Sequence, residues 1–232
     1  MKTSSRNTKL LMIAVLAFAI LALAVAFIPL GRTLFFSHGV KTEGIDESSL
    51  KSATTEIDGV WEVTNKPGPN QTSAGFTFAE VLPGDRRTTS GSTQGVRGSV
   101  TIEAGTLKAG EIVVDMTNIR TDSDVRDESV RRKIFHTDDF PEAKFVVTEP
   151  VDLSSVPEDG TMGTVDLTGN MTIHGETNTI TQTFNVARSG DQLLVAADIP
   201  INREDYGVKT PELVAAKIAE DGEINVRLDM RK

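Results

Sequence analysis

The segment that decides the fold runs from Thr117 to Phe145 and reads TNIRTDSDVRDESVRRKIFHTDDFPEAKF. It begins as an extended chain and continues into a short charged helix, which we expect between Asp124 and Thr137. Pairs of opposite charge spaced i,i+4 support that helix, and its apolar residues fall on one side. Phe140-Pro141 marks its end, and a strand follows. The charge pairs are Asp127–Arg131 and Glu128–Arg132, and the apolar residues are Val130, Ile134 and Phe135.

Outside this segment the dominant hydrophobic period is two, which is typical of strands with one apolar face. The inward positions include Phe76, Phe78, Val100, Ile102, Ile112, Val114, Met116, Phe145, Val147, Met171, Ile173, Ile224, Val226, Leu228 and Met230. Turn residues separate these runs at 83–85, 104–105, 157–160, 189–191 and 221–222. A second short helix is expected over 211–219, where Pro211 suits a first helical turn. Many short strands at this spacing predict an all-β sandwich or barrel.

Two further motifs complete the pattern: LTGNMTIHGET at Leu167–Thr177 and NREDYGV at Asn202–Val208. In this order and spacing, the three segments resemble the YceI-like family of polyisoprenoid-binding proteins, over roughly residues 58–230. The resemblance implies a lipocalin-like antiparallel barrel of about eight strands with one or two short helices. It also implies that the barrel encloses an elongated apolar chain, such as a polyprenyl lipid or an isoprenoid quinone, as its ligand, without any other cofactor.

The resemblance assigns roles to individual residues. Gly98, Leu167 and Gly169 match family strand positions, and Thr121, Arg126 and Asp127 match its Thr…Arg-Asp motif. We interpret Arg126 and Asp127 as a pair that pins the helix across one barrel end, with direct ligand contact as the alternative. Ser129 stands where many members have histidine, so a head-group contact there is not carried over. The expected ligand-binding residues are Phe76, Phe78, Val96, Ile112, Val114, Phe135, Phe140, Phe145, Val147, Met171, Ile173 and Phe184.

The N-terminus carries a hydrophobic run from Leu10 to Leu30 without a charged residue, long enough to cross about 30 Å of hydrocarbon. Basic residues in 1–9 place that end in the cytoplasm, so the rest of the chain is exported. A cleaved signal peptide is the alternative, since Ala24-Val25-Ala26 is an acceptable cleavage site. Either way, residues 31–57 are expected to form a flexible tether and 58–232 the barrel domain.

Composition excludes several classes of function. The chain has no cysteine, which excludes thiolate chemistry, disulfides and a lipobox anchor. Three of the 24 Lys and Arg residues precede Gly31 and all 33 Asp and Glu follow it, so the exported part carries −12 and would repel nucleic acid. His38, His136 and His174 lack metal-ligand spacing, and Asp122, Asp124 and Asp127 lack the glycine and terminal glutamate of a calcium loop. We therefore expect neither a catalytic nor a metal site.

The interior of such a barrel has two possible uses. A closed sheet of about eight strands can be filled by side chains or can hold one small ligand. The alternation of residues taken alone favours a filled core, which would suit a ligand-free surface-interaction or stress-protection module. The family resemblance favours a non-enzymatic lipid carrier held at the outer face of a membrane.

Overall fold

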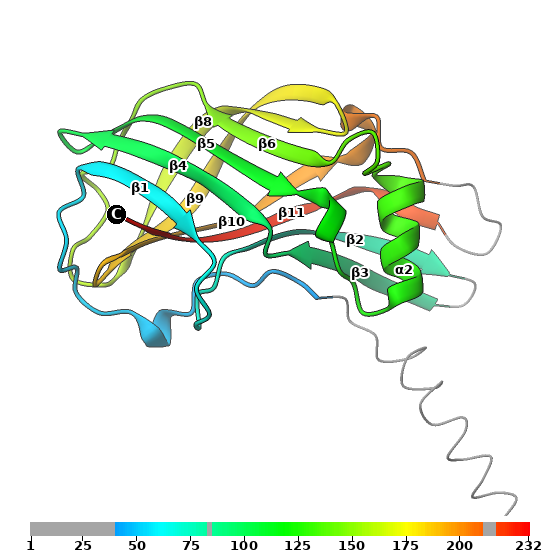
Figure 1. Ribbon diagram of the computed structural model, residues 1–232, viewed down its shortest axis with the longest axis horizontal. Helices are drawn as coiled ribbons and strands as arrows, with labels where there is room; N and C mark the ends of the chain where they lie inside the picture. Colours follow the sequence, from blue (N-terminus) through cyan, green and yellow to red (C-terminus); the bar gives the residue numbers. More distant parts are fainter. Residues whose placement is uncertain (1–39, 83–84, 211–216) are drawn as a thin grey trace, which may run out of the picture. The chain divides into compact units, whose positions relative to one another are not determined.

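The computed structural model describes residues 40–82, 85–210 and 217–232. They form an antiparallel β-barrel with a short helix at one end (Figure 1). The strands are β1 Gly59–Thr64, β2 Ser73–Leu82, β3 Asp85–Thr93, β4 Val96–Glu103, β5 Thr106–Asp115, β6 Glu142–Val147, β7 Val151–Asp152, β8 Met162–Ile173, β9 Glu176–Ser189, β10 Gln192–Asn202 and β11 Lys217–Arg231. The helical elements are η1 Glu47–Ser49, η2 Met116–Asn118, α2 Asp124–Ser129, η3 Val130–Ile134 and η4 Arg203–Tyr206.

Eight strands of the described chain form a closed ring. Their order is β1, β4, β5, β6, β8, β9, β10 and β11, and β11 returns to pair with β1. All these pairings are antiparallel. The prediction of an antiparallel barrel of about eight strands is therefore confirmed.

The hairpin of β2 and β3 lies outside this ring order and pairs with the first part of β11. β11 is long enough to pair first with β2, over Lys217–Arg227, and then with β1, over Asp229–Arg231. The expected turn at Asp221-Gly222 is wrong, because both residues lie inside β11 at a register shift. Glycine suits that bulge because a Cβ at Gly222 would overlap the Phe78 ring.

The charged helix is confirmed, since α2 and the π-helical turn η3 together span Asp124–Ile134. The second expected helix, over 211–219, falls partly on residues 211–216, which lie outside the described part. Its last three residues, 217–219, belong to β11 instead. Pairing of Lys217 and Ile218 with β2 satisfies backbone groups there and overrides the helical pattern of the sequence.

Residues 40–57, expected to belong to a flexible tether, contact the barrel in the structure. The Thr42 hydroxyl shares a hydrogen bond with that of Ser73, and the Asn70 carboxamide accepts from the backbone of Asp46. Ala53 forms a parallel bridge with Gly190. This part of the chain is therefore held along the barrel surface.

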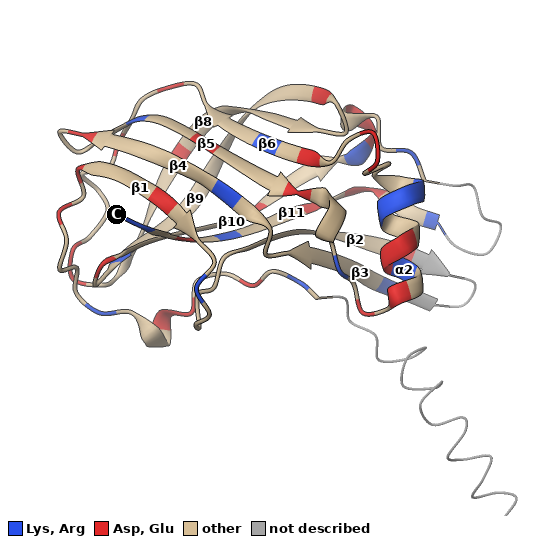
Figure 2. Ribbon diagram, viewed as in Figure 1, with Lys and Arg blue, Asp and Glu red and all other residues tan. Residues whose placement is uncertain are grey.

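The outer surface is polar, and acidic and basic residues are interspersed over the strands and α2 (Figure 2). Along β8, side chains alternate between the core, for example Met171, and the solvent side, for example Thr172. Among the described residues no helix is long and apolar enough to cross a membrane. The expected span at Leu10–Leu30 lies outside the described residues and stays a prediction.

Candidate functional site

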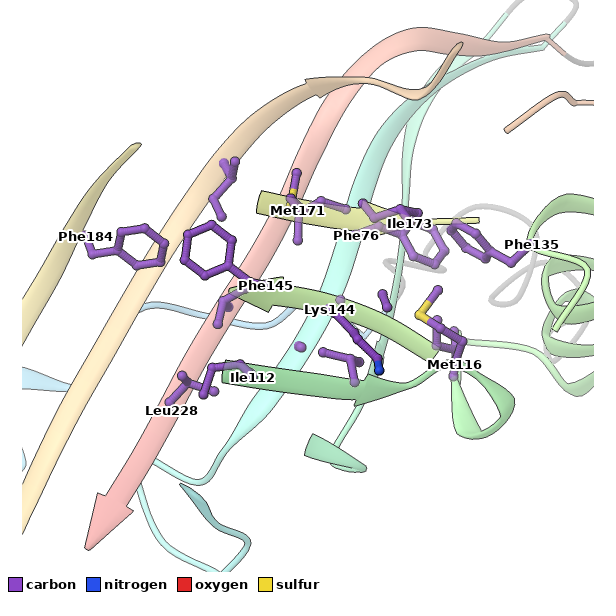
Figure 3. Close-up of a pocket in the computed structure, with 18 residues that line it drawn as sticks. Phe76, Ile112, Met116, Phe135, Lys144, Phe145, Met171, Ile173, Phe184 and Leu228 are labelled. Atoms are coloured by element: carbon purple, nitrogen blue, oxygen red, sulfur yellow. The ribbon is translucent and has the colours of Figure 1, made fainter. Parts of the chain in front are cut away.

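The interior of the barrel contains an apolar cavity of about 100 Å³. Side chains of β2, β5, β6, β8, β9, β10 and β11 surround it, and residues around η2 and η3 close one side (Figure 3). We call it the main cavity. Its walls are apolar side chains and one glycine, apart from Lys144, which also pairs with Glu142 at 3.7 Å. The lining residues are Ala74, Gly75, Phe76, Ile112, Val114, Met116, Ile119, Phe135, Ala143, Lys144, Phe145, Met171, Ile173, Phe184, Ile199, Ile224, Val226 and Leu228.

A second cavity of about 50 Å³ lies at the helix end of the barrel. It shares four lining residues with the main cavity: Phe76, Phe135, Ile173 and Ile224. The ring centroids of Phe76 and Phe135 are 5.4 Å apart with planes tilted by 60°. Because both rings border both spaces, this pair forms a partition between the two cavities.

One charged residue borders the second cavity. Arg203, only 6 % exposed, donates from Nη1 to the carbonyl of Val208 at 2.7 Å and from Nε to that of Ala219 at 3.2 Å. These bonds attach η4 to the following loop and to β11, which compensates for burying the charge. The NREDYGV motif therefore has a structural explanation at this end of the barrel.

Nine of the twelve expected ligand-binding residues line one or both cavities. They are Phe76, Phe78, Ile112, Val114, Phe135, Phe145, Met171, Ile173 and Phe184. Val96 is buried and Val147 packs against the core, but neither borders the main or the second cavity. Phe140 lies outside both, with its ring centroid 4.3 Å from that of His174.

Several cavity residues were missed. Ile119 lies in an irregular segment where no period marks it, whereas Ile199 lies in β10 between exposed Asp198 and Pro200. Ile224, Val226 and Leu228 alternate as clearly as Phe76 and Phe78, so the same signal could have assigned them to the site. Ala143 is small, and only its position two residues before Phe145 on β6 marks it as inward.

The Thr…Arg-Asp motif lies beside the cavities, where Asp127 is 2 % exposed. One carboxylate oxygen accepts hydrogen bonds from the Thr121 backbone at 2.5 Å and the Thr121 hydroxyl at 2.6 Å. Arg120 approaches the other oxygen at 3.5 Å. Burial alone would raise the pKa of Asp127, but the hydrogen bonds from Thr121 and Arg120 outweigh it, and the net pKa is lowered.

The interpretation of Arg126 and Asp127 as a pair is wrong. Arg126 forms an ion pair with Asp122 instead, because consecutive helical residues do not face each other. The expected Asp127–Arg131 pair is likewise replaced by Asp127–Thr121, whereas the Glu128–Arg132 pair is confirmed at 2.6 Å. Asp127 and Arg126 therefore both attach the helix to the segment before it, Asp127 through Thr121 and Arg126 through Asp122.

His136 and His174 lie at the same barrel end, with ring centroids 5.5 Å apart. Burial, and then the neighbouring His136, lower the pKa of His174, against the opposing effects of the Tyr206 backbone, Glu176 and Asp139. Within the described residues no group of three His, Cys, Asp or Glu side chains could hold a metal ion. This arrangement of an apolar interior and dispersed titratable groups suits binding of an apolar molecule.

Comparisons with known proteins agree with this architecture. A polyisoprenoid binding domain from Saccharophagus degradans, implicated in plant cell wall breakdown, superimposes with a TM-score of 0.57 at 19% identity, covering 74% of this chain and 97% of that one. BcnA of Burkholderia cenocepacia superimposes with a TM-score of 0.54 at 18% identity, covering 68% and 94%. A comparison with curated proteins finds no match. The model of the YceI-like domain matches residues 66–230, and the chain therefore belongs to the YceI-like family.

Proposed function

We propose that this protein binds an isoprenoid-type apolar lipid in the barrel cavity, as a carrier or buffer and not as an enzyme. The observation that carries the proposal is the main cavity, whose walls are apolar and include the rings of Phe76, Phe135, Phe145 and Phe184. A polyprenyl chain has no groups that need hydrogen bonds, so a cavity lined by apolar side chains is sufficient to bind it. The Saccharophagus degradans domain, which shares the fold, is described as polyisoprenoid-binding.

The energetics suit this ligand. Each buried CH₂ unit contributes about 0.8 kcal/mol, so a few isoprene units supply substantial affinity without polar contacts. A chain longer than the main cavity has to pass the partition formed by Phe76 and Phe135 to reach the second cavity. Rotation of an aromatic side chain is a small conformational change, so lipid entry would join two spaces that are separate without ligand.

We propose further that the barrel is held at the outer face of a membrane by the apolar segment Leu10–Leu30. Isoprenoid lipids reside in membranes, so this placement would put the cavity beside its ligand. Because the chain lacks cysteine, a single cysteine at exposed Ala109 should react with a membrane-impermeant maleimide on intact cells. Labelling only after lysis would contradict this placement. If the mature protein begins near Phe27, the apolar segment is a cleaved signal peptide and not an anchor.

The decisive experiment is to purify the full chain in mild detergent and to identify co-purified apolar molecules by native mass spectrometry and solvent extraction. Ala143→Phe should fill the main cavity and lose the lipid. The matched variant Ala109→Phe, on the exposed surface of β5, should retain it. Wild-type protein that carries no apolar molecule, and takes up none from vesicles, would instead support a filled barrel that acts as a ligand-free interaction module.

A further inference from the structure

The barrel wall has a seam beside the main cavity. β3 and β4 are joined by the short connection Gln94-Gly95, yet they pair with different strands and diverge. Residues Met116–Thr121, which we call the cover segment, run past β3 on the way from β5 to α2 (Figure 1). β3 pairs with β2 along its length, and the isolated bridge Ser92–Arg120 is the one other pairing that the described residues give it.

The cover segment has one apolar and one polar side. Met116 and Ile119 are 8 % and 2 % exposed and line the main cavity. Asn118 and Arg120 line an outer pocket of about 610 Å³ on the opposite side, together with Ser92 of β3. The cover segment alone therefore separates the apolar main cavity from the polar outer pocket. A lipid with its apolar chain in the main cavity could place its polar head group in the outer pocket.

The wall is also thin on the β3 side. A Cβ placed on Gly91 would lie 2.9 Å from the Phe76 ring and 3.0 Å from Thr121 Cγ2. The backbone of β3 therefore contacts a cavity-lining ring and the cover segment directly, without a side chain between them. A small displacement at this point would open the main cavity to the outer pocket.

The cover segment is attached unequally on its two sides. Two backbone hydrogen bonds, both 2.8 Å, join Arg120 to Ser92 of β3. On the helix side, Thr121 makes two bonds to buried Asp127, Arg120 approaches that carboxylate at 3.5 Å, and Arg131 donates to the Ile119 carbonyl at 3.2 Å. Bonds to a buried charge are stronger than neutral ones, so the segment would separate from β3 and stay with the helix.

We propose that the seam between β3 and the cover segment is the portal through which the lipid enters the barrel. This inference rests on the proposed lipid-binding function. Opening breaks the two Ser92–Arg120 bonds and exposes Met116, Ile119 and Phe76 to the incoming chain. Val40–Glu43 line the same outer pocket, so the chain that continues from the expected membrane anchor meets the barrel at the portal.

A disulfide across the seam tests the portal. Ser92 and Arg120 exchange both backbone bonds, a geometry with Cα atoms about 5.5 Å apart, within disulfide range.

The chain has no other cysteine, and its single tryptophan, Trp61, reports occupancy by energy transfer to dansyl-labelled geranylgeraniol. The full-length S92C/R120C variant, mixed with phosphatidylcholine vesicles carrying that probe, should take it up at least tenfold more slowly when oxidised than after reduction. The matched variant T168C/T181C, whose native hydroxyls are 2.9 Å apart on β8 and β9, should show no difference.

A loosened seam should act in the opposite direction. Ser92→Pro removes the N–H that bonds to Arg120 and leaves the pairing with β2, since edge strands tolerate proline on the open side. It should speed uptake severalfold, whereas Thr88→Pro, at an exposed position of the same parity on β3, should not. Equal rates for oxidised and reduced S92C/R120C, or no gain with Ser92→Pro, would overturn the portal while lipid binding stood. Absence of uptake by wild-type protein would overturn the proposed function and the portal with it.

Discussion

Asp127 and Thr121 are joined by two hydrogen bonds that meet at one carboxylate oxygen, from the backbone N–H and the hydroxyl of Thr121. They are six positions apart in the sequence, and the chain folds back over Asp122 and Ser123 to bring them together. The contact fixes the start of α2 against the cover segment and so positions Phe135 at the partition between the cavities. One buried carboxylate thus connects the sequence motif to the shape of the site.

Asp127→Ala should destabilise the protein by about 3 kcal/mol, because it removes two charge-assisted bonds and leaves a buried N–H without its acceptor. Asp124→Ala serves as the control, since that side chain is fully exposed in the same helix, and its cost should stay within about 0.5 kcal/mol. Thermal unfolding followed by circular dichroism measures both. Equal melting temperatures for the two variants would show that Asp127 does not anchor the helix.

The same carboxylate should give a pH-dependent contribution to stability. Its pKa is lowered in the fold relative to the ordinary value of 3.8, so the folded state favours the charged form. The contribution is fully present above that value and is lost as pH falls through the folded pKa. The stability difference between wild type and Asp127→Ala should therefore be constant from neutral pH down to about 5 and shrink in stronger acid. If the stability difference between wild type and Asp127→Ala increased in acid, the pKa of Asp127 would not be lowered in the fold.

Arg126 should couple energetically to Asp122, its ion-pair partner, more strongly than to Asp127. Arg126→Ala leaves the largely buried Asp122 carboxylate, whose side chain is 11% exposed, without its cation. Adding Asp122→Asn should restore part of the lost stability. A double-mutant cycle should give a coupling of about 0.5 kcal/mol or more for this pair. A larger coupling in the corresponding cycle with Asp127→Asn would restore the paired interpretation drawn from the sequence.

His174 should make the fold less stable in mild acid. Its pKa is lowered from the ordinary 6.5, first by burial and then by His136, so the unfolded chain binds the proton more readily. Stability therefore falls as pH drops below 6.5 towards the folded pKa. His174→Asn, which tolerates the positive φ of 54°, should remove this pH dependence, and His136→Asn should only weaken it. Unfolding midpoints at pH 7 and pH 5 provide the measurement.

Strand parity explains why much of the site was predictable. Phe145 and Met171 belong to strands with one wet face, so a period of two fixes which side chains face inward. Ile119 could not be found this way, because its burial depends on how an irregular segment crosses the seam. Ile199 could have been found this way, because it is buried between exposed Asp198 and Pro200, whereas the earlier part of β10 buries both faces and lacks that contrast.

Two errors have a common cause in tertiary pairing. Asp221-Gly222 has the composition of a turn, but turn residues also suit a bulge within a continuous strand. Charge spacing suggested Arg131 as the partner of Asp127 and the family motif suggested Arg126, whereas the two short hydrogen bonds come from Thr121. A backbone N–H carries no sequence signature, so the pattern of side chains could not identify it.

Phe145→Gln should abolish lipid retention while β-structure is preserved. Phe145 lines the main cavity with its ring centroid 6.0 Å from that of Phe184, and a carboxamide there would need hydrogen bonds that an apolar chain cannot supply. The control is Val146→Gln, whose neighbouring position on β6 faces the other side of the sheet. Native mass spectrometry of the two purified full-length variants, with circular dichroism for the fold, makes the comparison. Lipid retained by Phe145→Gln but lost from Val146→Gln would place the ligand outside the barrel, because only the outer face would then have responded.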